Sequence, residues 1–222
     1  MPSPGDLRRE RLARARLYVV TGAREAQGDL AAFLAAVLEA GADIVQLREK
    51  EAEAGELLRW SKDFRAAADR HGALFVINDR PDVAPAAGAD GVHVGQNDLP
   101  PAWARQMVGP DMLIGLSTHT ISEFDAGAPE ADYLCVGPLA ATPTKPGRPA
   151  TGLEIVKHAA ARVRAGSEQR PWFAIGGIDT ASLPGVVAAG ATRIAVVRAA
   201  AGGDPGAAVS ALVAGLAPSR VS

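Results

Sequence analysis

The stretch ALFVINDRPDVAPAAGADGVHVGQND, residues 73–98, decides the fold. It holds two short apolar runs, residues 73–77 and 91–94, and each run ends in polar residues. Between them, residues 81–87 have the length and composition of a short helix, and Gly88 starts a Gly-Ala-Asp turn into the second run. Short runs rich in Val, Ile and Leu are typical of buried parallel strands. The stretch therefore predicts a strand–helix–strand unit of a parallel sheet.

The same alternation extends over the rest of the chain. Six more apolar runs have the character of buried strands: residues 17–20, 43–47, 113–116, 133–136, 172–175 and 193–197. Segments with helical spacing separate the runs: residues 29–40, 54–70, 101–107, 121–128, 153–164, 180–189 and 205–216. Eight such units in 222 residues fit a closed barrel better than an open doubly wound sheet. We predict an α/β protein, a single (β/α)8 TIM barrel forming the catalytic domain at residues 17–218, with a short N-terminal extension at residues 1–16.

The composition restricts the classes of partner. The formal net charge is −2 at pH 7, so a strongly basic face for nucleic acid or an anionic membrane is not expected. No apolar stretch approaches the roughly 20 residues that span a bilayer. The single cysteine, Cys135, cannot form an internal disulfide, which favours a cytoplasmic location. The Arg-rich residues 8–16 predict a solvated tail or a short helix beside the barrel rather than a transit peptide.

Candidate site residues gather where the predicted strands end. Barrel enzymes build their sites from the loops at the carboxyl ends of the strands. In this chain those loops carry Gln46, Arg48, Lys50, Asn78, Asp79, Asp98, Ser117, His119, Thr142, Thr144, Lys145, Gly176, Gly177 and Arg198. Any one of them is ordinary loop polarity, whereas their joint placement on one rim predicts an active site.

Two aspartates suggest a metal site. Asp79 and Asp98 follow neighbouring predicted strands, whose backbones lie about 4.8 Å apart. Mg²⁺ binds one or two protein carboxylates and completes its octahedral shell with water and substrate phosphates. Two aspartates at adjacent strand ends meet this requirement. Spacing alone leaves an equal alternative, in which both aspartates only cap the helices that follow.

Basic residues on the same rim predict anion binding. Arg48, Lys50 and Lys145 would neutralise a diphosphate leaving group, and Asn78 would donate an amide N–H to it. Each basic residue alone is more simply a solvated surface charge, but the cluster favours an anion site. The glycine pair 176–177 predicts a second anion site, the alternative being a plain tight turn. Two anion sites on one rim suggest a reaction that joins a diphosphate to a monophosphate.

The histidines and the cysteine carry less information. His93 lies inside a predicted strand, and His71 and His158 are expected at helix ends or on the surface, so no chemistry is assigned to them. His119 lies on the rim, where a histidine more often orients a loop than acts as a base. Cys135 has no adjacent base and is expected to belong to the core.

The motifs are specific enough to resemble one family. They are QLREK (46–50), IND (77–79), GVHVGQND (91–98), GLSTHT (115–120), VGPLAATPTKP (136–146) and AIGGI (174–178). Together they resemble thiamine-phosphate synthase, in order from Leu17 to about Ala200. The QLREK and VGPLAATPTKP segments are far more specific than any glycine pair.

The resemblance implies a transferase reaction. The pyrimidine substrate, 4-amino-2-methyl-5-hydroxymethylpyrimidine diphosphate, would condense with 4-methyl-5-(2-phosphoethyl)thiazole to give thiamine phosphate and diphosphate. The diphosphate would leave first, with Mg²⁺ as the cofactor, and the family suggests a homodimer. The resemblance also implies a role for each matching residue. Asp79 and Asp98 would hold Mg²⁺, and the diphosphate would be bound by Arg48, Lys50, Asn78 and Lys145. Ser117 and Gln46 would lie near the pyrimidine, and the thiazole phosphate would be held by Thr142, Thr144, Gly177 and Val197. Gly176 and Arg198 are further expected substrate-binding residues, and Arg48, Lys50, Lys145 and Ser117 are the expected catalytic ones.

Three positions depart from the family pattern. Asn97 stands where an acidic residue is common, Ala140 where an aromatic residue is common, and Arg198 where a small hydroxyl residue is common. Alternatives to the synthase are a thiazole tautomerase on the same fold, another phosphate-handling barrel, and a non-catalytic barrel that binds thiamine intermediates. The tautomerase needs no site for metal and diphosphate, so the charged rim disfavours it.

Overall fold

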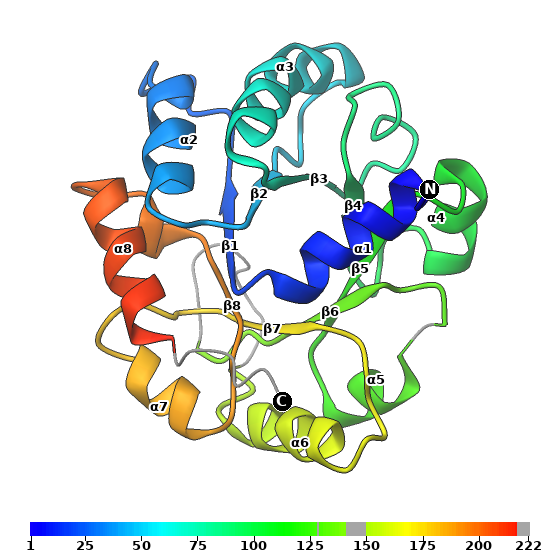
Figure 1. Ribbon diagram of the computed structural model, residues 1–222, viewed down its shortest axis with the longest axis vertical. Helices are drawn as coiled ribbons and strands as arrows, with labels where there is room; N and C mark the ends of the chain where they lie inside the picture. Colours follow the sequence, from blue (N-terminus) through cyan, green and yellow to red (C-terminus); the bar gives the residue numbers. More distant parts are fainter. Residues whose placement is uncertain (128, 141–149, 217–222) are drawn as a thin grey trace.

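Eight parallel strands form a closed barrel in the computed structural model, which describes residues 1–127, 129–140 and 150–216 (Figure 1). The strands are β1 (Leu17–Thr21), β2 (Ile44–Leu47), β3 (Leu74–Asn78), β4 (Gly91–Val94), β5 (Leu113–Thr118), β6 (Tyr133–Val136), β7 (Trp172–Ile175) and β8 (Ile194–Val196). The helices are α1 (Pro4–Arg14), α2 (Leu30–Glu39), α3 (Ala54–His71), α4 (Pro101–Val108), α5 (Ile121–Ala126), α6 (Glu154–Arg164), α7 (Leu183–Ala188), the 3₁₀ helix η1 (Arg198–Ala200) and α8 (Pro205–Gly215). Each strand pairs with the next, and β8 pairs with β1, so the predicted TIM barrel is confirmed.

Alternation along the strands separates two hydrophobic clusters. In β1, Leu17 and Val19 pack into the cluster between the barrel and its helices. Tyr18 and Val20 belong instead to a second cluster inside the barrel. Successive side chains of a strand point to opposite faces, so the parity of a position decides whether its side chain points inward. This parity later identifies which polar side chains reach the inside of the barrel.

One predicted helix is wrong. Residues 81–88 form successive turns between β3 and β4, instead of a helix over 81–87. Pro85 explains the difference, because it has no N–H to donate to the carbonyl of Pro81 and its ring clashes with that carbonyl in a helix. The other seven predicted helical segments each contain a helix. Within the described residues, none is long and apolar enough to cross a membrane.

Helix α1 lies across the amino-terminal end of the barrel (Figure 1). Its Leu12 is buried in the cluster inside the barrel. Arg8 Nε donates to Asp90 Oδ1 at 3.0 Å, and Arg9 Nε donates to Asp132 Oδ1 at 2.8 Å. The helix therefore covers the end of the barrel opposite to the predicted rim.

A repeated aspartate joins neighbouring strands at this end. Asp43, Asp90 and Asp132 immediately precede β2, β4 and β6, and each accepts a backbone N–H bond from the strand before. The donors are Leu17 at 3.0 Å, Phe75 at 2.9 Å and Ile114 at 2.8 Å. Arg193 holds the corresponding position before β8 and donates to the carbonyls of Ala13 and Ala15. These hydrogen bonds hold neighbouring strands together at the amino-terminal end of the barrel, opposite to the predicted rim.

Candidate active site

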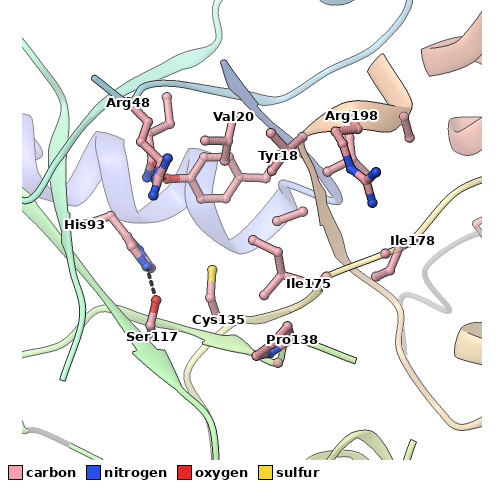
Figure 2. A pocket seen from close by; sticks show the side chains of 18 of the residues that line it. Tyr18, Val20, Arg48, His93, Ser117, Cys135, Pro138, Ile175, Ile178 and Arg198 are labelled. Carbon is pink, nitrogen blue, oxygen red and sulfur yellow. Dashed lines mark hydrogen bonds between the residues drawn. The ribbon is translucent and has the colours of Figure 1, made fainter. Parts of the chain in front are cut away.

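A cavity of about 310 Å³ opens at the carboxyl ends of the strands. Nine of the predicted site residues line it: Gln46, Arg48, Asn78, Ser117, His119, Gly176, Gly177, Val197 and Arg198. They come from the ends of β2, β3, β5, β7 and β8 or from the residues that follow, and Figure 2 shows several of them around one space. The closed barrel thus brings together residues that are up to 152 positions apart, from Gln46 to Arg198.

The segment that follows β6 lies only partly within the described residues. Thr142, Thr144 and Lys145 fall outside them, so their predicted roles stay predictions. The described chain resumes at Ala150, and the backbone N–H of Thr151 donates to the carbonyl of Pro138 at 2.8 Å. This bond holds Thr151 beside Pro138, which lines the cavity.

A pair of carboxylates, Asp79 and Asp98, lies next to Asn78 of the cavity lining, although neither aspartate nor Lys50 is itself among the described residues that line the cavity. Asp79 directly follows β3, and Lys50 Nζ lies 3.1 Å from its Oδ2. Burial raises the pKa of Asp79 above its usual value, and the neighbouring Asp98 raises it further through a hydrogen bond and charge repulsion. Lys50 lowers the pKa but does not cancel these effects. Two carboxylates that oppose each other's ionisation form a site that a cation would stabilise.

The backbone aims these carboxylates toward each other. Asp79 has a left-handed conformation with φ of 61°, which is uncommon for a residue other than glycine. Its N–H donates to the carbonyl of His93 at 2.8 Å, and the N–H of Gly95 donates to Asp98 Oδ2 at 2.8 Å. Among the described residues, no group of three His, Cys, Asp or Glu side chains is placed to hold a metal ion. The residues fit an ion such as Mg²⁺, which needs only one or two protein carboxylates.

Two guanidinium groups face the cavity. Figure 2 shows Arg48, which follows β2, and Arg198, which follows β8, on different sides of it. Within the part of the chain that the structure describes, neither is paired with a carboxylate. Both are therefore available to bind an anion.

The glycine pair after β7 allows a close approach between loops. Gly176 and Gly177 have φ of 103° and 72°, a region that side chains rarely adopt. A Cβ on Gly176 would lie 2.5 Å from Pro138 Cα, and a Cβ on Gly177 would lie 2.7 Å from Ala140 Cβ. The N–H of Ala140 also donates to the carbonyl of Gly176 at 3.1 Å. This pair is more than a plain turn, because the loop after β6 packs directly on it.

Sequence reasoning missed part of the cavity. His93, to which no chemistry was assigned, lines the cavity, and so does Tyr18. His93 Nε2 lies 2.9 Å from Ser117 Oγ, as Figure 2 shows. The signal that identifies His93 is parity, because its neighbours Val92 and Val94 pack outward against the helices.

Two further polar residues of the motifs hold loops in place. The backbone N–H of His119 donates to the Glu123 carboxylate at 2.6 Å, and its ring is hydrogen-bonded to the carbonyl of Gly137. Glu49, inside the QLREK motif, accepts a bond from the N–H of Ala23 at 2.7 Å. The contacts of His119 join the loops after β5 and β6, which is the arrangement expected of a residue that orients a loop.

Comparison with known proteins places this chain in one family. A family model described as thiamine monophosphate synthase matches residues 17–200. A protein named thiamine-phosphate synthase from Acidothermus cellulolyticus is 53% identical over 209 residues, which cover 93% of this chain and 97% of that protein. One of the same name from Mycobacterium leprae is 52% identical and covers 93% of this chain and 92% of its own.

A solved structure agrees with the sequence matches. The structure titled thiamine phosphate pyrophosphorylase from Pyrococcus furiosus has a TM-score of 0.79 and 31% identity. The match covers 94% of this chain and 96% of that one. The family match spans every strand of the barrel and every rim residue described above, and on these grounds the chain belongs to the thiamine monophosphate synthase family.

Proposed function

We propose that the chain is a transferase that condenses 4-amino-2-methyl-5-hydroxymethylpyrimidine diphosphate with 4-methyl-5-(2-phosphoethyl)thiazole. The products are thiamine phosphate and diphosphate. One observation carries the proposal in a chain of this family: the Asp79–Asp98 pair, with Lys50 on Asp79, directly follows Asn78 in the lining of a cavity that Arg48 and Arg198 also line. A tautomerase would leave the carboxylate pair without a use.

The diphosphate end is assigned to the basic rim. Arg48 and Lys50 stabilise the charge that develops on the leaving diphosphate, with an amide N–H from Asn78 and a contribution from Lys145. Asp79 and Asp98 hold Mg²⁺, which when bound supplies positive charge beside the departing phosphates. Lys50 Nζ forms an ion pair with Asp79 Oδ2 at 3.1 Å. One diphosphate group therefore contacts both the lysine and the metal site.

The two rings of the substrates occupy the inner part of the cavity. Gln46 and Ser117, which are buried, orient the pyrimidine. The thiazole phosphate binds Gly177, the backbone at Val197 and the guanidinium of Arg198, with Thr142 and Thr144 from the neighbouring loop. The aminopyrimidine releases diphosphate to leave a stabilised methylene cation, which the thiazole nitrogen then attacks. The protein supplies positioning, charge neutralisation and exclusion of water, and no covalent nucleophile is required.

Arg198→Ala is expected to weaken binding of the thiazole phosphate selectively. Loss of a charge-assisted hydrogen bond to phosphate should raise the KM for that substrate about ten-fold, with little change in the KM for the pyrimidine diphosphate. Steady-state kinetics with each substrate varied in turn measures both values. Arg162→Ala, a change at an arginine of helix α6 remote from the cavity lining, is the matched control. Equal effects on both KM values would contradict the assignment of Arg198 to the thiazole phosphate.

The proposed reaction is tested by product analysis. Purified protein is mixed with both substrates and Mg²⁺, and thiamine phosphate and diphosphate are quantified over time by chromatography and a phosphate-coupled assay. The expected result is equal molar amounts of the two products. Binding of the thiazole phosphate without formation of either product would favour the tautomerase or the non-catalytic alternative.

The proposal extends to the location and assembly of the chain. The single cysteine and the small-molecule substrates favour a cytoplasmic location, and the family favours a homodimer. The net charge of −2 gives no support for a nucleic-acid partner.

A further inference from the structure

Buried side chains form a continuous hydrogen-bond chain across the inside of the barrel. Gln46 Nε2 donates to the Tyr18 hydroxyl at 2.6 Å, and the hydroxyls of Tyr18 and Tyr133 lie 3.1 Å apart. The Tyr133 hydroxyl lies 3.3 Å from His93 Nδ1, and His93 Nε2 lies 2.9 Å from Ser117 Oγ. Gln46 and Ser117, the two ends, line the cavity, whereas Tyr133 in the middle does not. A tyrosine hidden from the cavity therefore connects two side chains that face it.

Gly115 makes this connection possible. Strand β5 lies between β4 and β6, and Gly115 is in register with His93 on one side and Tyr133 on the other. A Cβ at Gly115 would lie 2.1 Å from Tyr133 Cζ and 2.4 Å from His93 Nδ1. Any larger residue here would push the histidine and the tyrosine apart. The missing side chain on the intervening strand lets two side chains from non-adjacent strands form a hydrogen bond.

The hydrogen bonds of this chain all run from donor to acceptor in one direction, from Gln46 to Ser117. Burial raises the pKa of both Tyr18 and Tyr133 well above the usual value, so each keeps one proton to donate. Tyr18 accepts from Gln46, so its own proton is donated toward Tyr133, whose hydroxyl lies 3.1 Å away. Tyr133 then donates to His93 Nδ1, which leaves the imidazole proton on Nε2 for donation to Ser117 Oγ. Among the described residues, no hydrogen bond uses the proton of Ser117 or the amide oxygen of Gln46, and both groups lie at the cavity.

We propose that Tyr18, Tyr133 and His93 are positioning residues that set which cavity group donates and which accepts. With the direction above, Gln46 presents an acceptor and Ser117 presents a hydroxyl donor. An aminopyrimidine offers the complementary groups, because its amino group donates and its ring nitrogen accepts. The match to an aminopyrimidine rests on the proposed function, whereas the direction of the hydrogen-bond chain does not.

The direction is tested first on the ligand-free protein. The chain has four histidines, and long-range ¹H–¹⁵N spectra of protein labelled at histidine distinguish the Nε2–H tautomer, the Nδ1–H tautomer and the imidazolium. The signals of His93 are identified by their loss in His93→Gln. We expect His93 as the Nε2–H tautomer. Finding it as the Nδ1–H tautomer or as the imidazolium would overturn the proposed direction.

Tyr133→Phe tests transmission through the hidden tyrosine. The ring keeps its edge contacts with Tyr18 and Phe173, and only the hydroxyl is lost. The signals of His93 should move toward a mixture of tautomers, while those of the other three histidines stay where they are. Unchanged His93 signals in folded Tyr133→Phe would overturn the proposal. If circular dichroism shows that this variant is unfolded, Tyr18→Phe breaks the next link and gives the same test.

Gln46→Glu tests the chain from its far end. At pH 9 the introduced carboxylate can only accept, so Tyr18 must donate to it, and every bond along the chain reverses. His93 should then carry its proton on Nδ1. In the double variant Gln46→Glu/Tyr133→Phe the chain is interrupted, and the introduced carboxylate should have no effect on His93. The same response with and without Tyr133 would show that the signal does not pass through the chain.

Kinetics test the link to the pyrimidine. Loss of the imposed polarity in Tyr133→Phe should raise the KM for the pyrimidine diphosphate about five-fold and leave the KM for the thiazole phosphate unchanged. If Tyr133 had only a structural role, the variant would change the KM values for both substrates. Absence of turnover in the unmodified protein would refute the proposed function. The NMR spectra of His93 would still test the direction of the hydrogen-bond chain. Turnover with equal changes in both KM values would refute the recognition of the pyrimidine by this chain.

Discussion

Asp79→Asn is expected to lower kcat/KM by about a thousand-fold, close to the effect of removing one main stabiliser of transition-state charge, about 4 kcal/mol. The reason is the loss of one of the two carboxylates that we propose hold Mg²⁺ beside the leaving diphosphate. Asparagine is the suitable replacement because it tolerates the left-handed backbone, with φ of 61°, that Asp79 adopts. The fold should therefore stay intact while the charge is lost. Steady-state kinetics at saturating Mg²⁺ measures the effect.

The control for this variant is Asp82→Asn. Asp82 lies three residues further along the same loop and forms an ion pair with Arg80 at 2.7 Å. Its carboxylate is half exposed and, unlike that of Asp79, it is not paired with Asp98, so turnover should change less than two-fold. Near-normal turnover of Asp79→Asn at low Mg²⁺ would exclude Asp79 as a metal ligand.

Asp90→Ala is expected to lower the free energy of unfolding by about 3–5 kcal/mol and the midpoint of thermal unfolding by about 10 °C. The Asp90 side chain is only 8% exposed and accepts bonds from Arg8 at 3.0 Å, from Arg65 at 2.8 Å and from the backbone N–H of Phe75 at 2.9 Å. Its removal leaves two buried or half-buried guanidinium groups and a strand N–H without this acceptor. Urea unfolding followed by circular dichroism gives the free energy, and an unchanged slope would show that the unfolded state is the same.

Asp69→Ala is the matched control for stability. Asp69 also pairs with Arg65, at 2.9 Å, but its side chain is 68% exposed. Exposed ion pairs one helical turn apart contribute little, so a change of about 0.5 kcal/mol or less is expected. Equal effects of Asp69→Ala and Asp90→Ala would mean that the buried position at the base of the barrel has no special importance.

Much of the barrel was predictable from the sequence because its parallel strands are buried on both faces. The strand Gly91–Val94, for example, is an apolar run bounded by turn residues and was predicted with its exact limits. The contacts made by charged residues were not predictable. Asp29, directly before α2, is a residue type that favours an N-cap, but its carboxylate binds Arg24 at 2.6 Å and makes no cap bond. The pattern of arginines in α1 likewise does not reveal that they bind aspartates more than 80 positions away.

The candidate site was predictable where topology alone places a residue. Asp79 and Asp98 follow adjacent strands, so their proximity followed from the fold class, and the structure brings the two carboxylates together. The role of His93 in the cavity was missed because the prediction did not use the parity of its strand. Its bond to Tyr133 depends on the register of three strands and on the missing side chain at Gly115, which no local pattern reveals.

The dependence of turnover on Mg²⁺ shows whether the two aspartates hold a metal that the reaction requires. The protein is treated with EDTA, passed into metal-free buffer, and assayed for thiamine phosphate formation with both substrates while Mg²⁺ is added back. We expect no measurable turnover without metal and a saturable recovery as Mg²⁺ occupies the Asp79–Asp98 pair beside Lys50. Full turnover in EDTA would contradict a metal-assisted departure of diphosphate at this site.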